Sequence, residues 1–297
     1  MAKDGVTGIF VGRSTLDVVY GCARFPEPDG KVDAEVAYVA GGGPALNGAV
    51  AFAALGGRAR LCSVVGAGVF ADQARADIAA HGVELEDAAE GEADVLPVSS
   101  VILTGEARAI VNQPLPARAG GLPAGRLERL FAARPDILLS DGHLPELALP
   151  ILRRAREAGV RTVLDGGSWK PWTAELLPWI DVAVVSSRFR PPAAPEAADV
   201  LALLRAHVAA AAITSGPGPI LWSAGEGSGV IRPPQVAAVD TLGAGDILHG
   251  AFCHAYARGS GMDGDFSASL ASAAGIASSA CAFWGPRRWI AERAGEG

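Results

Sequence analysis

Short apolar runs rich in β-branched residues alternate with helical patterns along most of this chain. The first strand is expected at residues 6–11, the first helix at 45–55 and the next strand at 60–65. Such alternation is typical of an α/β fold in which helices cover both faces of a mostly parallel sheet. The pattern continues in strands expected at 136–140, 161–164, 182–185, 210–214 and 220–223, and in helices expected at 71–81, 146–158, 246–258 and 264–282.

Two regions break this alternation. Residues 17–20 with 31–40, and residues 98–103 with 108–112, have the pattern of paired strands. They predict a small β-lid, at about 17–40 and 98–112, on a single domain that spans residues 1–297. Because the edge strands of a lid leave unpaired backbone groups, we expect a homodimer formed through it.

Composition argues against several classes of function. The chain has 25 basic and 32 acidic residues, a net charge of −7 and no basic run, so a nucleic-acid partner is not expected. It has no apolar run of the roughly 18 residues that a membrane span requires, and no basic-then-apolar leader. Its four cysteines are scattered without a CxxC pair, as expected of reduced thiols in the cytoplasm.

The segment 239–250, VDTLGAGDILHG, points most directly to chemistry. Three small residues, Gly243, Ala244 and Gly245, come immediately before Asp246 at the start of an expected helix. Backbone N–H groups converge at such a helix start, and with the helix dipole they form a cradle for an anion. A carboxylate beside this cradle can take the proton of a hydroxyl that attacks a phosphoryl group. The alternative is that Asp246 only caps the helix.

The expected phosphate site is not a P-loop. The Gly30-Lys31 pair is followed by Val32 and lacks the upstream glycine of GxxxxGK[ST]. Neutralisation of the phosphate charge is therefore expected from backbone N–H groups, a metal ion and an arginine. The helix dipole should also keep the pKa of Asp246 low, so we expect a weak base that acts through its orientation.

VDTLGAGD closely resembles the C-terminal signature of the ribokinase-like (PfkB) sugar-kinase family. The family's N-terminal signature, two glycines followed by an asparagine, matches GGPALN at residues 42–47. The resemblance covers nearly the whole chain and implies a three-layer α/β/α fold with a central, mostly parallel sheet and a small β-lid. It also implies an ATP-dependent carbohydrate kinase that uses Mg²⁺. The tract from GGGPALNGAVAFAALGG to VLDGGSW is most similar to ketohexokinases and sulfofructose kinases.

By this resemblance, Asp246 is the catalytic base, and the backbone of Gly243, Ala244 and Gly245 is the anion hole for the γ-phosphate. Relatives hold a monovalent cation through the first aspartate of the motif, so Asp240 is a candidate potassium ligand; a turn-forming residue is the alternative. Many relatives carry Asn-x-x-Glu after a mid-sheet strand, where this chain has VSSRF at 185–189. Mg²⁺ is then expected to be held by the nucleotide phosphates and water.

The resemblance also implies the sugar contacts. Gly42, Gly43 and Asn47 would contact hydroxyls of the sugar. Asp17 matches an early aspartate of the family, and a carboxylate can hold two adjacent hydroxyls and discriminate against analogues that lack them. Asp29, in PDGKV, is a further candidate, with a turn aspartate as the alternative.

For the nucleotide, a Thr-Ser-Gly sequence follows an expected strand, as the Thr-x-Gly nucleotide contact of the family does. An ordinary turn is the alternative. The segment 274–285 resembles the wall around adenine. The candidate nucleotide-binding residues are Thr214, Ser215, Gly216, Ala274, Ala277 and Gly285.

The lid and the loops offer further candidates for selecting the sugar. Lys31 would reach an anionic group, with a solvated strand-end lysine as the alternative. Asn112 and His143 are candidates for the sugar pocket, although a lone loop histidine is often incidental. Trp169 and Trp172 either shape the mouth of the pocket or pack on the surface. Arginine is the better bidentate reader of an anion, and the sequence places none at the sugar.

Rival functions are weighed against the same residues. A nucleoside kinase of this fold would carry lid residues that stack on a base, and the lid strand AEVAYVA offers only Tyr38. A non-catalytic sugar sensor would have lost Asp246 or the glycines before it, and all are present. A dinucleotide oxidoreductase is disfavoured because VGRS, after the first strand, lacks GxGxxG. We therefore expect a cytoplasmic kinase whose partners are a small sugar and ATP.

Overall fold

The computed structural model describes residues 5–105, 107–114, 120–259 and 265–295. Its body is a nine-stranded sheet with the order β13-β12-β11-β10-β9-β8-β1-β4-β5. Neighbours from β5 to β11 are parallel, and β12 is antiparallel to both of its neighbours, so the predicted mostly parallel sheet is confirmed. The strands are β1 (Thr7–Val11), β4 (Arg58–Ser63), β5 (Glu84–Asp87), β8 (Ile137–Ser140), β9 (Arg161–Gly166), β10 (Val182–Ser186), β11 (Ala210–Thr214), β12 (Ile220–Ala224) and β13 (Gly227–Ile231).

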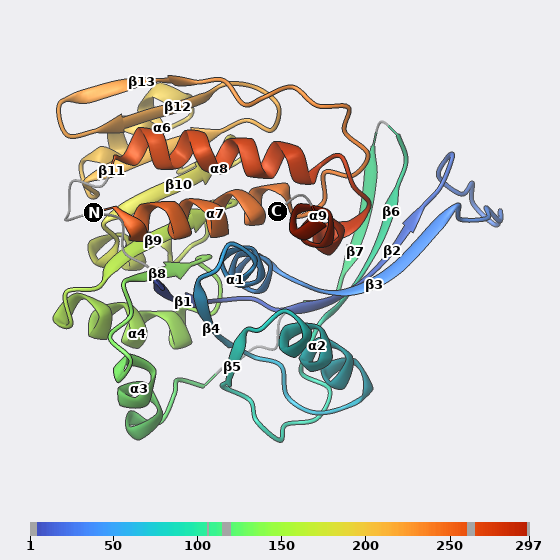
Figure 1. The fold of residues 1–297 in the computed structure, drawn as a ribbon, viewed down its shortest axis with the longest axis horizontal. Coiled ribbons are helices and arrows are strands. Elements are labelled where there is room, and N and C mark those ends of the chain that lie inside the picture. Colours follow the sequence, from blue (N-terminus) through green and yellow to red (C-terminus); the bar gives the residue numbers. More distant parts are fainter. Residues whose placement is uncertain (1–4, 106, 115–119, 260–264, 296–297) are drawn as a thin grey trace.

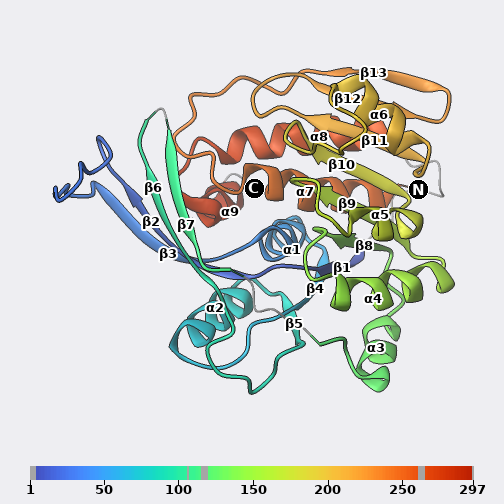
Figure 2. The same ribbon diagram turned by 180° about the vertical axis from the view of Figure 1, so that it is seen from behind.

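Helices cover both faces of this sheet and give three layers, with α1, α7 and α8 on one face and α4 and α6 on the other (Figure 1 and Figure 2). Two neighbouring residues of β1 show the division, because Phe10 packs into the core under α1, α7 and α8, whereas Ile9 packs into the core under α4 and α6. The helices are α1 (Pro44–Ala54), α2 (Val69–Ala80), α3 (Ala124–Phe131), α4 (Pro145–Glu157), α5 (Thr173–Leu176), η1 (Leu177–Trp179), α6 (Ala197–Arg205), α7 (Ala244–Arg258), α8 (Phe266–Ala280) and α9 (Gly285–Gly295).

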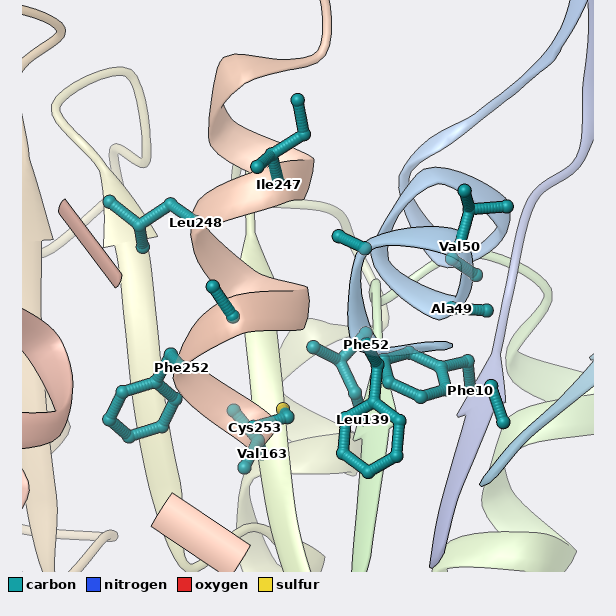
Figure 3. Close-up of a cluster of buried hydrophobic side chains, with 14 of the residues drawn as sticks. Phe10, Ala49, Val50, Phe52, Leu139, Val163, Ile247, Leu248, Phe252 and Cys253 are labelled. Atoms are coloured by element: carbon teal, nitrogen blue, oxygen red, sulfur yellow. The ribbon is translucent and has the colours of Figure 1, made fainter. Parts of the chain in front are cut away.

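Helices α1 and α7 pack closely over the sheet (Figure 3). Phe52 of α1 meets Phe10 edge to face, with ring centroids 5.3 Å apart, and Phe252 of α7 belongs to the same core. A Cβ atom on Gly250 of α7 would lie 2.2 Å from the carbonyl oxygen of Gly48 of α1. The glycine therefore lets the two backbones touch, and this contact brings the start of α7 next to α1.

A second sheet of four strands, in the order β3-β2-β6-β7, stands off the body as a lid (Figure 1). On its inner face, the buried side chains of Val19 and Val101 pack with Tyr38 and with Trp284 from the loop after α8. The outer face is open, and Val39 is 47% exposed there. The lid strands are β2 (Thr15–Gly21), β3 (Val36–Gly42), β6 (Val98–Leu103) and β7 (Arg108–Asn112).

Several element bounds differ from the prediction. The strand predicted at residues 31–40 is wrong over 31–35, because the pairing with β2 ends where Gly21 faces Val36. Of the helix predicted at 264–282, residues 266–280 are helical, and residue 264 lies outside the described residues. Strands β5 and β13 and helix α9 were not predicted, since β5 has four residues and the sequence of β13, GSGVI, contains two glycines.

No single helix among the described residues is long and apolar enough to cross a membrane. Helices α8 and α9 pass that test of length and composition only as a pair, and they meet at an angle of 106°. The apolar residues of α8 contribute to the core beneath it.

Candidate active site

The predicted site lies where the carboxyl ends of the central strands border the lid (Figure 1). The chain leaves β1 at Val11 and enters the lid strand β2 at Thr15, so the two sheets share this edge. Helix α7 starts here as well, because Asp246 in its first turn lies near Asp165 at the end of β9. In parallel α/β sheets, ligands bind outside the carboxyl ends of the strands.

Asp246 accepts a hydrogen bond from Asn47 and lies at a helix start whose backbone N–H groups are in part unengaged among the described residues. The Asn47 side-chain amide donates from Nδ2 to Asp246 Oδ2 at 2.7 Å. Gly243 caps α7 with a φ of 76°, a left-handed conformation that favours glycine. The amide of Ala244 donates to the Thr241 carbonyl, whereas those of Gly243, Gly245 and Asp246 have no acceptor among the described residues. Three N–H groups around the start of α7 are therefore available to an anion.

The environment of Asp246 reverses the expected direction of its pKa. Burial, together with the nearby Asp165 carboxylate, raises the pKa of Asp246 to about 7, and the hydrogen bond from Asn47 opposes this increase. The low pKa predicted from the helix dipole is therefore wrong, because desolvation by the surrounding protein outweighs the dipole. The side chain keeps a partly exposed surface, through which a hydroxyl can reach it.

A network that the sequence did not predict holds the other end of the Asn47 amide. Arg287 donates from Nη1 to Asn47 Oδ1 at 2.9 Å and from Nη2 to the Gly41 carbonyl at 2.8 Å. The same guanidinium forms an ion pair with Asp77 at 3.0 Å. Both ends of the Asn47 amide are thus engaged, and its NH₂ group faces Asp246. Arg287 belongs to α9, which has no periodic pattern that would have revealed it.

Asp17 lies on the inner face of the lid. It is paired with Ser99 of β6, which is paired in turn with Asn112 of β7, so the three side chains form one row across the strands. Burial raises the pKa of Asp17, and the hydrogen bond from the Thr15 hydroxyl, at 2.7 Å, opposes this effect. A Cβ atom on Gly42 would lie 2.1 Å from the Asp17 carboxylate, so only glycine leaves room for that carboxylate.

Asp141, at the end of β8, organises the loop that carries the predicted sugar-site residue His143. Its carboxylate accepts hydrogen bonds from the backbone N–H groups of Arg13 at 2.8 Å, Ala45 at 3.3 Å and His143 at 2.9 Å. Burial lowers the pKa of the half-buried His143 ring. Three chain segments therefore meet on the Asp141 carboxylate. Because its pKa is lowered, the His143 imidazole is neutral at pH 7.

A second buried group of charges lies at the end of β9. Asp165 is 6% exposed and lies 3.4 Å from Nδ1 of His249, and Lys170 is 9% exposed. Burial raises the pKa of Asp165 and lowers that of Lys170. These residues come from a strand, a loop and a helix, so no sequence spacing could have identified them as a group.

Asp240 is enclosed by hydrogen-bond donors. Its carboxylate accepts hydrogen bonds from the Tyr38 hydroxyl at 2.9 Å, the Gly285 amide at 3.0 Å and the Leu242 amide at 2.8 Å. The bond to Leu242, two residues on, has the geometry expected of the turn-forming alternative. Among the described residues, no group of three His, Cys, Asp or Glu side chains could hold a metal ion.

The candidate nucleotide residues are spread over two environments. Thr214 ends β11, and Ser215 and Gly216 form an exposed turn after it. In contrast, Ala274 and Ala277 of α8 are 2% and 6% exposed and pack in the core, so their methyl groups do not face a ligand. The predicted Gly285 is placed beside the lid, where a Cβ atom would lie 3.2 Å from the Tyr38 ring.

Two lid candidates are not brought to the site. Asp29 and Lys31 are exposed in the loop that follows the far end of β2, away from the end that borders the body (Figure 2). Asp29, with a φ of 60°, lies within the tight turn that the Gly30 N–H closes on the Glu27 carbonyl, as the turn alternative predicts. Trp169 and Trp172 are partly buried against the core under α4 and α6.

Comparison with known proteins identifies relatives of this arrangement. The model of the pfkB family carbohydrate kinases matches residues 9–282. A protein of Agrobacterium tumefaciens assigned as a ribokinase is 26% identical, with 98% of this chain and 97% of that chain covered and a TM-score of 0.81. Arabidopsis thaliana ribokinase, solved with ribose and ATP, is 20% identical (95% and 94% covered, TM-score 0.73). Escherichia coli phosphofructokinase-2, solved with potassium, is 18% identical (97% and 95% covered, TM-score 0.69).

Proposed function

Because the chain belongs to the pfkB family of carbohydrate kinases, we propose that it transfers the γ-phosphate of ATP to a hydroxyl of a small sugar, with Asp246 as the general base. One observation carries this assignment: a carboxylate with a pKa of about 7 lies at the start of α7, beside three amides without an acceptor among the described residues. A base that titrates near neutral pH can take a proton during the transfer, and the amides can stabilise the phosphoryl oxygens.

The reaction needs few groups from the protein. The sugar hydroxyl attacks the γ-phosphorus, the bond to the ADP oxygen breaks, and the hydroxyl proton passes to Asp246, with inversion at phosphorus. Asn47 and Arg287 keep the carboxylate aligned, and the amides of Gly245 and Asp246 bind the transferred group. Asp17, on the lid, accepts hydrogen bonds from other hydroxyls of the sugar.

Mg²⁺ supplies charge neutralisation at the phosphates when it is bound, and it would be held by the nucleotide and water. For a monovalent cation, we propose Asp240 as a ligand next to the anion-binding turn. Rates in potassium and in a bulky organic-cation buffer should then differ, and equal rates would remove Asp240 from the site.

The decisive test is Asp246→Asn, with ATP consumption followed over a panel of ketoses, aldoses, sugar phosphates, sulfosugars and nucleosides. We expect turnover to fall by about 10²–10⁴-fold while ATP still binds. Because the folded state raises the pKa of Asp246, its ionisation destabilises the fold as pH rises. The variant should therefore be at least as stable as the wild type at pH 8. Near-normal turnover in the variant would contradict the assignment of the base.

A nucleoside substrate is less well supported. Tyr38 is the aromatic residue of lid strand β3, and its hydroxyl is bonded to Asp240 while its ring lies against Gly285. A ring held at both its edge and its face is not free to stack on a base. Turnover of nucleosides ahead of all sugars in the panel would reverse this ranking.

We further propose a cytoplasmic homodimer that forms through the outer face of the lid. The register places Val39, Val18, Ser100 and Val111 in one row across the four strands, and Val111 is 72% exposed. Three valines in a row of four on an open sheet face favour contact with a second copy. The cytoplasm supplies the ATP that the reaction consumes.

A further inference from the structure

Arg13 carries a charge that has no carboxylate partner among the described residues. It follows Gly12 at the end of β1, and its backbone N–H is fixed by Asp141. Its side chain donates from Nη2 to the Gln113 carbonyl at 3.3 Å, whereas Nε is buried without an acceptor. Among the described residues, no carboxylate oxygen lies within 4.0 Å of this guanidinium. Within the described part of the chain, the side chain of this half-buried arginine thus has one partner, the neutral Gln113 carbonyl.

Other enclosed arginines of the chain have more partners. Arg75, Arg126 and Arg287 each contact a carboxylate, those of Asp87, Glu86 and Asp77. Arg161 and Arg205 each donate to at least two backbone carbonyls instead. Among the described residues, Arg13 is the arginine whose Nε is buried without an acceptor. Enclosing a charge without such a partner costs free energy, because water no longer solvates it. A group that lowers stability in this way is expected where it binds a ligand.

The position of Arg13 agrees with this expectation. Its charge acts on Asp17 of the lid and on His143 of the β8–α4 loop, both predicted sugar-site residues. Hydrogen bonds give the same placement. The backbone N–H groups of Arg13 and His143 share the carboxylate of Asp141. Nη2 of Arg13 contacts Gln113, the residue after Asn112 of the lid row that contains Asp17. Arg13 therefore lies at the border between lid and body, where a substrate held by Asp17 can extend toward it.

We infer that Arg13 forms an anion subsite, so that the preferred substrate is a small sugar derivative bearing a carboxylate, sulfonate or phosphate remote from the hydroxyl that is phosphorylated. This inference rests on the proposed function and narrows its substrate class. The guanidinium is planar and always charged, and it presents donors that match two oxygens of such a group. The neutral His143 ring beside it adds no competing positive charge.

The test compares matched substrates that differ in one anionic group: fructose against fructose 6-phosphate and 6-deoxy-6-sulfofructose, and glucose against gluconate. The wild type should prefer at least one anionic member, and that preference identifies the anion. Arg13→Gln should lower kcat/KM for it by about 100-fold, mainly through KM, with less than about 3-fold change for the neutral partner. The kcat/KM of Arg13→Lys for the anionic substrate should fall between the values of the wild type and Arg13→Gln. Arg24→Gln, in the exposed lid loop, is the matched control.

Two further measurements separate the possible failures. Without substrate, Arg13→Gln should keep or raise Tm, since an unmatched charge is removed; a purely structural arginine would lower it. A wild type that prefers neutral sugars, or an anion preference that survives Arg13→Gln, would overturn the subsite. If no sugar drives ATP consumption, the proposed function fails, and calorimetric binding of the same anionic sugars to wild type and Arg13→Gln still decides the subsite.

Discussion

The two sheets of this protein use the same backbone pattern for different purposes. The nine-stranded sheet is covered on both faces, and its central strand β8 is buried at every position. The lid is covered on one face, and all five residues of its edge strand β7 are exposed. Under the proposed function, the covered body would place the groups that bind phosphate, whereas the lid would supply groups that contact the variable part of a substrate. Substitutions should accordingly affect stability in the body and specificity or assembly in the lid.

The largest effect is expected in the body, at the contact of α1 with α7. Gly250→Ala should destabilise the protein by about 2–3 kcal/mol, because the added methyl meets the Gly48 carbonyl oxygen at 2.2 Å. Gly275→Ala in α8, where a Cβ atom meets nothing within 4 Å, should instead add about 0.5–1 kcal/mol. Urea unfolding measures both. Equal effects at the two glycines would show that helix packing does not limit stability here.

The next effect tests the link between body and lid through Arg287. The wild-type kcat/KM should rise with pH through about 7, because the base must be ionised. In Arg287→Gln the Asn47 amide is free to rotate away from Asp246, and the hydrogen bond that lowers the pKa of this base is weakened. We expect kcat to fall by about 10–100-fold and the acid limb to move to higher pH.

The adjacent Arg288→Gln is the control for this prediction, since its side chain is 65% exposed. A purely structural role for Arg287 would lower Tm and leave the midpoint of the pH profile where it is. That result would confine the catalytic groups to α1 and α7.

A smaller effect on stability is expected where the lid contacts the segment 239–250, at the hydrogen bond between Tyr38 and Asp240. Tyr38→Phe removes the hydrogen bond to Asp240, which keeps two backbone donors. The loss should be about 1–2 kcal/mol in urea unfolding, with a higher KM for the sugar. Tyr20→Phe, on the outer face and 41% exposed, should change neither quantity. Equal behaviour of the two variants would mean that the inner face does not hold the lid closed.

The smallest effect on stability is expected on the outer face of the lid. Val111→Lys should change the free energy of unfolding by less than about 0.5 kcal/mol, because the side chain is already 72% exposed. If two lids pack together, the same charge should dissociate the dimer, as light scattering would show. Val69→Lys on α2, at 82% exposed, is the control. A dimer that persists in Val111→Lys would exclude this face.

Much of the body could be predicted because its elements are long and regular. Strand β11 was predicted with its observed bounds, and β1 differs by one residue, since apolar runs of this length have few alternatives in an α/β pattern. The start of β3 was misplaced, because strand pairing with β2 sets it and not the composition of residues 31–35. Short elements such as β5 carry too little pattern to be recognised.

The candidate site divides in a similar way. The motif around Asp246, the glycines with Asn47, and Asp17 could be named from their sequence context. Arg287 could not, because it meets Asn47 across 240 residues of chain. Arg13 could not be named either, because what sets it apart is that its buried Nε has no hydrogen-bond acceptor among the described residues, which a sequence does not reveal.

By itself, then, the sequence determined the α/β class, the family and the residues of its two motifs, because periodicity and short motifs are local properties. Only the tertiary structure decided which side chains meet and how they titrate. Desolvation and the charge of Asp165 raise the pKa of Asp246, although the local helix dipole favours the opposite. Burial, and the distances between groups far apart in the chain, exist only once the two sheets and their helices have packed together.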